Sequence, residues 1–388
     1  MIKMTNKAQR RVKILEMVKE KQIKQTEAAD RLGISYRQLK RIYKTYNLKG
    51  DEALNHGLIG KQGNNRTDEF VKEMIMKIVR NEFKDYKPTF ISEKLLECYH
   101  VVMRSNTLRK WMMKEHLWEK TKKMSKHRNR RQRKEHFGEM IQMDGSPHDW
   151  LGIGQELCLM HMVDDSNNTA FGLFDTGETT DIALRALYEW ITKYGVPQSI
   201  YSDHGGVFYV DREPSIEEQL KGINPKTRFG QVCEDLGIEM IYANSPQAKG
   251  RVERANGVQQ DRLLNDLKYY GIKTMEDANR FLKNGYWDKH NSRFSKKSVS
   301  DADYHIPLFD CQDLRNLVCY KEERKISQDF VVRLNNRLFQ LIKEQKIELR
   351  PRNEVIIKTW LDGSIHIFKK EIELEYREII AKDNQNIA

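Results

Sequence analysis

Hydrophobic and polar positions alternate differently in three successive stretches of the chain. Residues 10–114 repeat apolar side chains every three to four positions, which is the spacing of short amphipathic helices. Residues 139–267 alternate short apolar runs with longer helical segments, and residues 330–369 are short alternating runs separated by turn residues. The pattern therefore predicts a multidomain protein with an all-α front, an α/β centre and an antiparallel β end.

Residues 10–48 are predicted to form three short helices, and residues 25–46 have the layout of a helix-turn-helix. Thr26 is expected to cap the first helix of this pair, Gly33 to make the turn and Ser35 to cap the second helix. The outward residues of the second helix can reach base edges and phosphates: Tyr36, Arg37, Gln38, Lys40, Arg41 and Lys44. An ordinary helical hairpin is the alternative, and the basic, hydrogen-bonding outer face favours DNA binding.

A second helical region follows a stretch rich in Gly and Asn. Helices are expected at residues 67–81, 92–99 and 105–114, again with a capped third helix. Ordinary helix packing is the alternative here too, because short amphipathic helices are common. Two helix-turn-helix-like units would let one chain read an extended DNA site.

The centre of the chain is predicted to be a mixed α/β sheet. Strands are expected at residues 139–144, 156–163, 169–174, 199–202 and 239–243, and helices at 179–194, 229–236 and 246–267. The last of these helices is expected to be capped by Ser245, with Pro246 in its first turn. Three strands before the first helix, followed by alternation, is the element order of the RNase H-like fold.

The last third is predicted to be a small antiparallel β-barrel. Its strands are expected at residues 330–334, 337–342, 346–351, 354–359 and 364–369, with tight turns at Asn335-Asn336 and Asp362-Gly363. The predicted boundaries are a helix-turn-helix unit at 1–56, a second helical unit at 66–118, a basic linker at 119–136, a catalytic core at 137–305 and the barrel at 325–375.

Charge is distributed unevenly along the chain. Residues 1–136 hold 35 Lys and Arg against 16 Asp and Glu, a net charge of +19, and the remaining residues hold 33 against 40, a net charge of −7. Residues 120–134 contain nine Lys and Arg and no acid, and Arg128, Arg130 and Arg131 among them are expected to contact phosphates. A basic front half is the electrostatic signature of a nucleic-acid partner.

The composition excludes several other classes of protein. Hydrophobic residues make up 39% of the chain, and no apolar run reaches the length of a membrane span. The N-terminal residues lack the apolar stretch of a signal peptide, so a cytoplasmic protein is expected. The five cysteines are scattered without the spacing of a zinc site, which predicts reduced structural thiols.

Three acids lie at the expected strand ends and at the start of the long helix, where an α/β sheet usually places its active site. Asp144 is expected to end the first strand, Asp203 to end the fourth, and Glu253 lies in the first turns of the long helix. Phosphoryl transfer uses two hard cations about 3.5–4 Å apart, and such cations take oxygen ligands. Each acid alone is more typical of a cap or a surface charge.

The sequences around these acids, read together, resemble a known family. IQMDGSPHDW around Asp144, YSDHGGVF around Asp203 and SPQAKGRVERAN around Glu253 are similar to the three motifs of transposases with a retroviral-integrase-like core. KHNSRF at residues 289–294 is similar to the Tyr-Asn-x-x-Arg-Pro-His segment that closes that core. The chain most resembles bacterial insertion-sequence transposases of the DDE type, particularly the ISNCY group. The zinc domain at the front of retroviral integrases is replaced by the helix-turn-helix units.

The resemblance implies a catalytic and metal-binding triad of Asp144, Asp203 and Glu253. It implies two Mg²⁺ ions per active site, with Mn²⁺ as a substitute, and cleavage at transposon ends followed by attack of the freed 3′-hydroxyls on target DNA. The partners it implies are double-stranded DNA, at inverted repeats and target sites, and further copies of the chain, in a dimer or larger assembly. Such a protein is associated with the nucleoid when it is on DNA. Lys249, Arg251 and Arg254 flank Glu253 and are expected to contact phosphates or to screen the acids.

The spacing departs from the family pattern. Between Asp203 and Glu253 lie 49 residues, more than is usual in the family, and the excess is expected in a polar inserted loop at residues 209–228. The more usual spacing would select Glu239, which lacks the flanking motif and begins its strand. Asp164 and Asp165 are interpreted as a turn cap rather than as metal ligands.

Two other functions remain open. One is a DNA-binding regulator that derives from a transposase and has an inactive core, which would bind without cleaving. The other is a simple RNase H-like nuclease, which would cut DNA but not join it. The acids at all three motif positions disfavour the first alternative, and two sequence-reading units disfavour the second.

Overall fold

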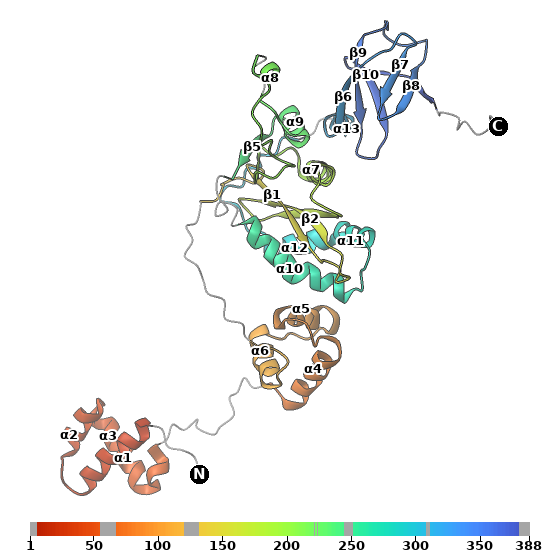
Figure 1. Cartoon of the computed structure of the whole chain (residues 1–388). Helices are drawn as coiled ribbons and strands as arrows, with labels where there is room; N and C mark the ends of the chain where they lie inside the picture. Colours follow the sequence, from red (N-terminus) through yellow and green to blue (C-terminus); the bar gives the residue numbers. More distant parts are fainter. Residues whose placement is uncertain are drawn as a thin grey trace. The chain divides into compact units, whose positions relative to one another are not determined.

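The computed structural model describes residues 6–54, 67–119, 132–220, 222, 224–243, 251–307 and 311–379. The chain divides into two compact units, Met1–Glu119 and Lys120–Ala388, each with its own internal packing (Figure 1).

The first three helices form a small apolar core around Leu15, Ala28 and Leu39. They are α1 (Asn6–Lys19), α2 (Gln25–Leu32) and α3 (Tyr36–Lys49), followed by a 3₁₀ turn, η1 (Asp51–Leu54). The predicted turn is confirmed, because Gly33 has a left-handed φ of 64° and the Ser35 side chain accepts a hydrogen bond from the Gln38 amide. The predicted Thr26 cap is wrong. Helix α2 already begins at Gln25, after Lys24 in an extended conformation.

Three further helices complete the first unit: α4 (Glu69–Glu82), α5 (Pro88–Tyr99) and α6 (Ser105–Lys114). Asp68 caps α4 by accepting hydrogen bonds from the amides of Phe70 and Val71. Helix α5 begins four residues earlier than predicted, because Pro88 is well suited to a first helical turn. The predicted cap of α6 is wrong, since Ser105 is inside the helix and Arg104 precedes it without a side-chain hydrogen bond.

The second unit is built on a mixed five-stranded sheet with the order β3-β2-β1-β4-β5. The strands are β1 (Ile141–His148), β2 (Leu157–Asp164), β3 (Ala170–Asp175), β4 (Ser199–Ser202) and β5 (Glu239–Tyr242). The first three are antiparallel neighbours, and β1, β4 and β5 are parallel. This is the predicted mixed sheet.

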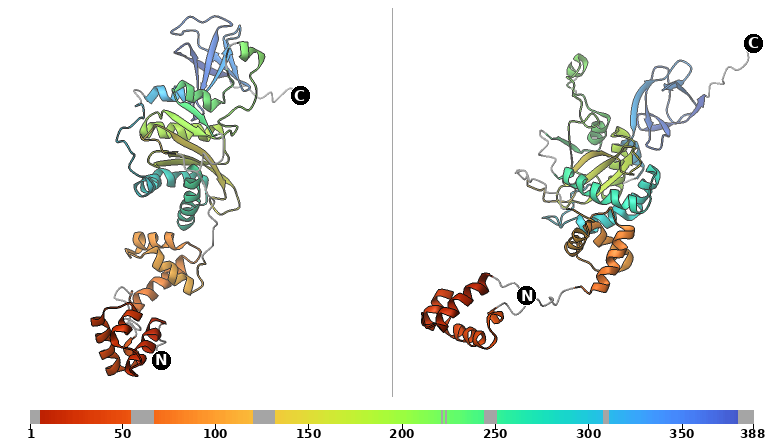
Figure 2. Two further views of the ribbon diagram at one scale, coloured as in Figure 1. Left: turned by 90° about the vertical axis from the view of Figure 1, so that its left-hand side faces the viewer. Right: turned by 60° about the horizontal axis from the view of Figure 1, so that its bottom comes forward.

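Helices cover both faces of this sheet (Figures 1 and 2). One face carries α7 (Thr180–Tyr194) and α9 (Arg228–Asp235), and the other carries α10 (Val252–Tyr269), α11 (Met275–Phe281), η3 (Leu282–Tyr286) and α12 (Trp287–Phe294). A single hydrophobic core runs through both layers, with Trp190 and Trp287 among its largest side chains. Every residue of β2 is buried, as expected for a strand covered on both faces.

Two predicted features of this region need correction. Asp144 lies in the middle of β1 rather than at its end, because pairing with β2 continues as far as His148 opposite Leu157. The expected loop at residues 209–228 contains a short helix, α8 (Ile216–Leu220). The predicted caps Ser245 and Pro246 lie outside the described residues, as does Lys249.

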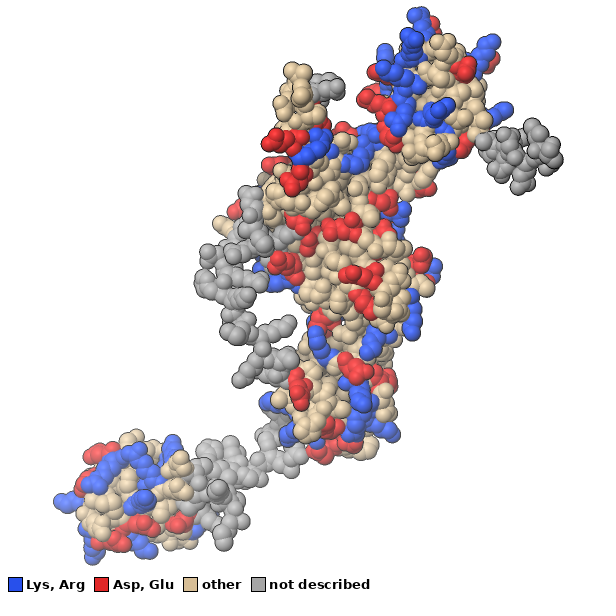
Figure 3. Space-filling view, viewed as in Figure 1, with Lys and Arg blue, Asp and Glu red and all other residues tan. Residues whose placement is uncertain are grey.

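The C-terminal strands form two separate antiparallel sheets, so a closed barrel is not confirmed. After α13 (Cys311–Leu317) come β6 (Tyr320–Lys325), β7 (Val331–Leu334), β8 (Arg337–Leu341), β9 (Glu354–Thr359), β10 (Ile365–Lys369), β11 (Ile372–Leu374) and β12 (Tyr376–Ile379). The sheet orders are β11-β10-β9-β6 and β12-β8-β7. The predicted strand at 346–351 is wrong, and β6 was missed because its sequence YKEERK has no apolar alternation. On the face drawn in Figure 3, basic side chains gather over these strands.

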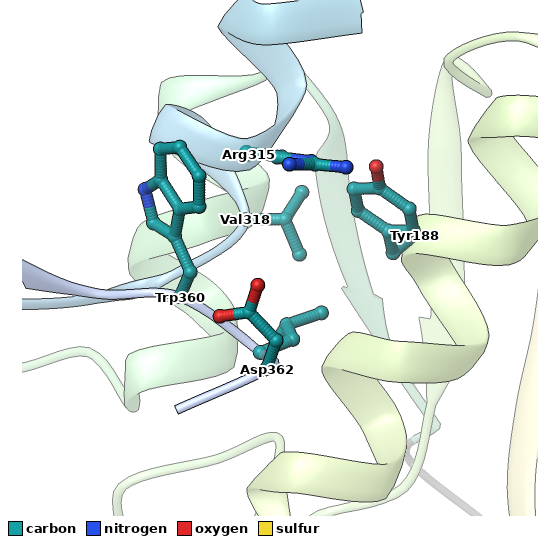
Figure 4. A pocket seen from close by; sticks show the side chains of 6 residues that line it. Tyr188, Arg315, Val318, Trp360 and Asp362 are labelled. Carbon is teal, nitrogen blue, oxygen red and sulfur yellow. The ribbon is translucent and has the colours of Figure 1, made fainter. Parts of the chain in front are cut away.

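The C-terminal strands contact the core through the region around α13. Arg228 of α9 donates two hydrogen bonds to the Cys319 carbonyl, at 3.2 and 2.7 Å. A cavity of about 180 Å³ lies beside this contact, where Tyr188 of α7 faces Arg315 and Trp360 (Figure 4). The Trp360 indole nitrogen is buried without a hydrogen-bond partner among the described residues.

None of the helices in the described parts of the chain combines the length and the apolar character that a membrane crossing requires. Among the cysteines whose side chains are described, Cys158, Cys233 and Cys319 are buried free thiols and Cys98 is an exposed one.

Candidate active site

A row of four residues crosses the sheet on the face that α10 covers. Asp144 of β1 is directly opposite His161 of β2, and His161 is directly opposite Gly172 of β3. On the other side, β1 and β4 are parallel, with Ile141 opposite Ile200 and Gln142 opposite Tyr201. Continued for two residues, this register brings Asp203 level with Asp144. Neighbouring strands are about 4.8 Å apart, so the two carboxylates leave adjacent backbones on the same face.

Asp203 begins the turn that follows β4. Its Oδ1 accepts a hydrogen bond from the Gly205 amide at 2.9 Å. A Cβ at Gly205 would lie 2.8 Å from that same oxygen, so a larger residue would displace the carboxylate. The His204 ring packs against Tyr209 and Tyr242, which holds the start of the turn.

Helix α10 runs along β1 in a matched register. The Val252 amide donates to Gln142 Oε1 at 3.1 Å, Asn256 Nδ2 to Asp144 Oδ2 at 2.9 Å, and Gln260 Nε2 to Ser146 Oγ at 3.3 Å. Four helical residues advance about 6 Å and two strand residues about 6.6 Å, so the two spacings nearly coincide. Three contacts of this kind fix both the position and the rotation of α10 over the strand.

Asn256 bridges the cross-strand pair Asp144 and His161. Its Nδ2 donates to the Asp144 carboxylate, so its Oδ1 must accept, and it lies 2.7 Å from His161 Nδ1. The proton of the imidazole is therefore on Nδ1. His161 is fully buried and burial lowers its pKa to about 4, which keeps the ring neutral. The Trp287 ring stacks against it, and its indole nitrogen donates to the Gly172 carbonyl.

Glu253 is exposed and lies on the β4 side of α10. Successive residues of a helix are rotated by about 100°. Relative to Asn256, Glu253 is rotated by about 60° in the same direction as Gln260, which contacts β1. Gln259 is rotated by about 60° in the opposite direction and accepts a hydrogen bond from the Tyr286 hydroxyl. Strand β4 is the neighbour of β1 on the side away from β2. Glu253 is therefore on the flank of α10 nearest to β4, the strand that leads to Asp203.

The acids Asp164 and Asp165 brace the start of α10 and the adjacent turn. Asp164 accepts hydrogen bonds from the amides of Gly138, Ser166 and Asn167. Asp165, which is fully buried, accepts from the Lys134 amide and from Gln142 Nε2, and forms an ion pair with Arg251. Both carboxylates are engaged in structural contacts, in agreement with the predicted turn cap.

Glu239 is at the wrong end of the sheet to join Asp144 and Asp203. It pairs with Ser199, the first residue of β4, whereas Asp203 follows the last. Four strand residues correspond to about 13 Å. Its exposed side chain is therefore remote from the row of acids.

The oxygen donors fit a hard cation in chemistry, but they do not form a closed three-ligand set. No group of three or more His, Cys, Asp and Glu side chains able to hold a metal ion occurs within the described ranges. Strands β1 and β4 pair at Ile141 and Gln142, and an extension of this register by two residues would bring Asp203 level with Asp144. Helix α10, which carries Glu253, lies on the same side of the sheet as Asp144. These three residues are the ones that could hold a divalent metal.

The predicted DNA-contacting residues are in part placed by the structure. All six on α3 are exposed, and the Lys40 ammonium lies 4.8 Å from the centre of the Tyr36 ring. Arg254 is exposed and Arg251 is mostly buried. Arg128, Arg130 and Arg131, like Lys249, lie outside the described residues. Sequence reasoning missed His161 and Asn256, and the Asn of the motif RVERAN was the only signal for either.

Comparisons with known proteins agree with this architecture. A homeodomain-like domain model matches residues 5–55. The predicted transposase y4bF of Sinorhizobium fredii is 32% identical over 388 residues, covering 99% of this chain and 83% of that protein. The transposase of insertion sequence IS1202 from Streptococcus pneumoniae is 29% identical over 377 residues, covering 87% of this chain and 78% of that one. The protein therefore belongs to the bacterial insertion-sequence transposases.

Solved structures show weaker likenesses. The HTLV-2 integrase catalytic core domain in complex with magnesium is 19% identical with a TM-score of 0.30, covering 39% of this chain and 85% of that one. A chain from the cryoEM structure of the simian T-cell lymphotropic virus intasome in complex with PP2A regulatory subunit B56 gamma is 12% identical with a TM-score of 0.35, covering 74% of this chain and 99% of that one. Likenesses of this size do not bear on which residues act or on what they bind.

Proposed function

We propose that this transposase cuts and joins DNA through a DDE triad made of Asp144, Asp203 and Glu253. The observation that carries the proposal is the double register. The parallel pairing of β1 with β4, extended by two residues, would bring Asp144 level with Asp203, and three contacts along β1 fix the rotation of the helix that bears Glu253. A transposase must act on phosphodiester bonds, and three carboxylates from three elements are the donor set that such chemistry uses.

Two Mg²⁺ ions, with Mn²⁺ as a substitute, are the proposed cofactors. When bound, such ions activate the attacking oxygen and stabilise the leaving one. The role of the protein is to position the carboxylates. Asn256 restrains the Asp144 carboxylate through Oδ2, His161 restrains Asn256, and the Gly205 amide restrains the Asp203 carboxylate. Because His161 is neutral, it orients Asn256 without adding a positive charge that would compete with a cation.

The helical unit at residues 6–54 is proposed to bind the terminal inverted repeats. Helix α3 presents its six exposed polar and basic side chains on one side and buries Leu39 and Tyr46 on the other. Exposed guanidinium and amide groups on a recognition helix can reach base edges, and lysines can reach phosphates. Two element ends must be held together during joining, so we also propose a dimer or larger assembly on DNA.

The proposed order of events is end cleavage followed by joining. In the first step water attacks a phosphodiester at the transposon end, and the leaving group is a DNA 3′-hydroxyl. In the second step that hydroxyl attacks a phosphodiester of target DNA and displaces the 3′-hydroxyl of the target strand, so the number of phosphodiester bonds is conserved. Neither step needs a Ser or Tyr nucleophile of the protein.

The test uses the full chain with labelled DNA that carries the inverted repeats of the element, in Mg²⁺ or Mn²⁺. We expect the wild-type protein to nick the repeat ends and to join them to a second DNA molecule. Asp203→Asn should abolish both steps while repeat binding remains. Asp211→Asn, which removes an exposed acid from the following loop, is the matched control and should be fully active.

The outcomes separate the proposal from its two rivals. Binding without cleavage by the wild-type chain would indicate a regulator with an inactive core. Cleavage without joining would indicate a simple nuclease. Equal activity of Asp203→Asn and wild type would overturn the triad.

A further inference from the structure

A cavity of about 300 Å³ lies on the opposite flank of α10 from Glu253, against α12 and the turn between β2 and β3. Four cationic side chains line it: Arg133, Arg251, Arg254 and Lys296. Its floor is apolar and includes Val258 and Phe294. We call this cavity the basic pocket. The pocket-lining residues of α10 are rotated by about 100° to 160° from Glu253, so the helix separates the pocket from the acids.

Two cations of the basic pocket, Arg133 and Arg251, are held in place by the surrounding structure. Arg133 Nη1 donates to the carbonyls of Asp165 and Ser166, at 3.1 and 3.0 Å, and to Asn168 Oδ1 at 2.9 Å. This anchor uses one nitrogen of a group that carries five N–H donors. Arg251 is anchored by its ion pair with the buried Asp165. The Lys296 amide donates a hydrogen bond to the Asn167 carbonyl at 2.7 Å, which fixes the backbone of Lys296.

These positive charges are close enough to oppose one another. The pKa of Arg133 is lowered, first by burial and then by the neighbouring charges of Arg251 and Arg254, while Asp165 and Asp164 act in the opposite direction. Burial in turn raises the pKa of Asp164, although this carboxyl accepts hydrogen bonds from the amides of Gly138, Ser166 and Asn167. Four cations line the pocket beside two carboxylates, Asp164 and Asp165, that are engaged in structural contacts, and this excess of positive charge favours an anionic ligand.

The floor of the basic pocket indicates more than a bare phosphate. The Phe294 ring lies under the Arg262 guanidinium at 4.5 Å and beside the His290 ring at 4.7 Å. Burial, together with the nearby positive charges of Arg262 and Arg293, lowers the pKa of His290 to about 3, so this ring is neutral and adds apolar surface. A concave site with an apolar floor and a cationic rim suits a ligand that has an aromatic part and an anionic part.

We propose that the basic pocket binds one unpaired nucleotide of a DNA strand. Its phosphate would lie among Arg133, Arg254 and Lys296, and its base or sugar on the floor beside Phe294. A duplex keeps the faces of its bases stacked on one another, so it has no base face to offer and would leave the apolar floor unused. The pocket thus selects a strand end or flank that is not paired, about one helix diameter, roughly 10 Å, from the acids. This inference rests on the proposed action on DNA ends.

The test measures binding by the full chain without cleavage, in EDTA, by fluorescence anisotropy. One probe is a blunt duplex that carries the inverted repeat, and the other is the same duplex with a three-nucleotide unpaired tail. Stacking of one base on an aromatic ring contributes about 1–3 kcal/mol, so we expect the tail to improve wild-type affinity by roughly 5- to 150-fold. Arg254→Gln with Lys296→Gln should remove most of this preference and lower the salt dependence of tail binding by about 0.7 per lost phosphate contact.

The matched control is Arg280→Gln with Lys283→Gln, which removes the same charge from exposed ion pairs with Asp277 and Glu189. It should keep the full preference for the tail. Phe294→Leu should keep the salt dependence and lose part of the preference. The inference is overturned if the pocket variant weakens blunt and tailed probes equally, or if the wild type shows no preference. Because no cleavage is measured, Asp203→Asn should bind both probes like the wild type, so failure of this inference is distinct from failure of the triad.

Discussion

The two flanks of α10 use the same helix in opposite ways. On the β1 side, neutral groups are in contact with the acids, and Asn256 and His161 restrain Asp144 without a positive charge. On the α12 side, Arg251 and Arg254 gather with Arg133 in a basic pocket. One flank is suited to cations and the other to anions, although Glu253 and Arg254 are adjacent in sequence. The rotation of the helix, and not the local composition, therefore separates the two kinds of site.

The acid flank depends most on Glu253. We expect Glu253→Gln to lower end cleavage and joining by on the order of 10³-fold, which is the loss typical when one preorganised charge-stabilising group is removed. Binding to the inverted repeat should be unchanged, because the residue does not belong to the helical units. Glu239→Gln is the control and should remain active. If Glu239 proved essential and Glu253 dispensable, the assignment of Glu253 to the triad would be wrong.

The basic flank depends on Arg251 for stability. Its side chain is 14% exposed and its partner Asp165 is fully buried, so Arg251→Gln leaves a buried carboxylate without its ion pair. Losses of this kind cost about 3–5 kcal/mol in the free energy of unfolding. Arg185→Gln breaks the exposed pair with Asp181 and should cost less than about 1 kcal/mol. Chemical denaturation of both variants is the measurement, and equal small losses would contradict a structural role for Arg251.

Loss of the contacts that position Asp144 should lower the activity less than removal of a carboxylate does. Asn256→Leu removes both hydrogen bonds of the bridge, and changes around metal ligands typically cost 10- to 100-fold in activity or metal affinity. We expect a rise in the Mg²⁺ concentration needed for half-maximal cleavage, with unchanged repeat binding. His161→Gln keeps a donor toward Asn256 and should retain more activity than His161→Leu. If the metal requirement of Asn256→Leu equals that of the wild type, the bridge has no positioning role.

The two buried histidines make stability dependent on pH. His161 on the acid flank and His290 beside the basic pocket have native pKa values lowered to about 4 and about 3. Below their ordinary pKa of about 6.5 the unfolded chain binds protons that the native state does not, so stability is present above this pH and is lost as pH falls toward 4. Each ring should cost about 2 kcal/mol between pH 7 and pH 5. His290→Gln should reduce this loss by about half, measured by denaturation at both pH values.

Local features of the fold were predictable from the sequence, whereas features fixed by packing were not. Gly33 and Ser35 predicted their turn, because a left-handed residue and a cap are set by local backbone geometry. Thr26 failed as a cap, since nothing in the residue types alone excludes a helix that starts two residues earlier. Strand β6, with its charged sequence, and the two separate C-terminal sheets depend on pairing between distant segments.

The candidate site shows the same division. The motifs singled out Asp144, Asp203 and Glu253, and the sheet order supports a common location for the first two. The link from His161 through Asn256 to Asp144 joins residues 95 and 112 positions apart, and it exists only because α10 lies in register with β1. For the basic pocket, the sequence predicted only single arginines as phosphate contacts. The floor of the pocket comes from another helix and its rim from the turn between β2 and β3, so the pocket depends on packing between distant segments.

The most direct test of the triad is a change of metal preference. Asp203→Cys replaces a hard oxygen ligand by a softer thiolate, which accepts Mn²⁺ more readily than Mg²⁺. Joining of a pre-cut repeat end should be lost in Mg²⁺ and restored in part in Mn²⁺, whereas Glu239→Cys should join equally well in both. Activity of Asp203→Cys at the wild-type level in Mg²⁺ would contradict metal binding by Asp203 and, with it, the proposed site.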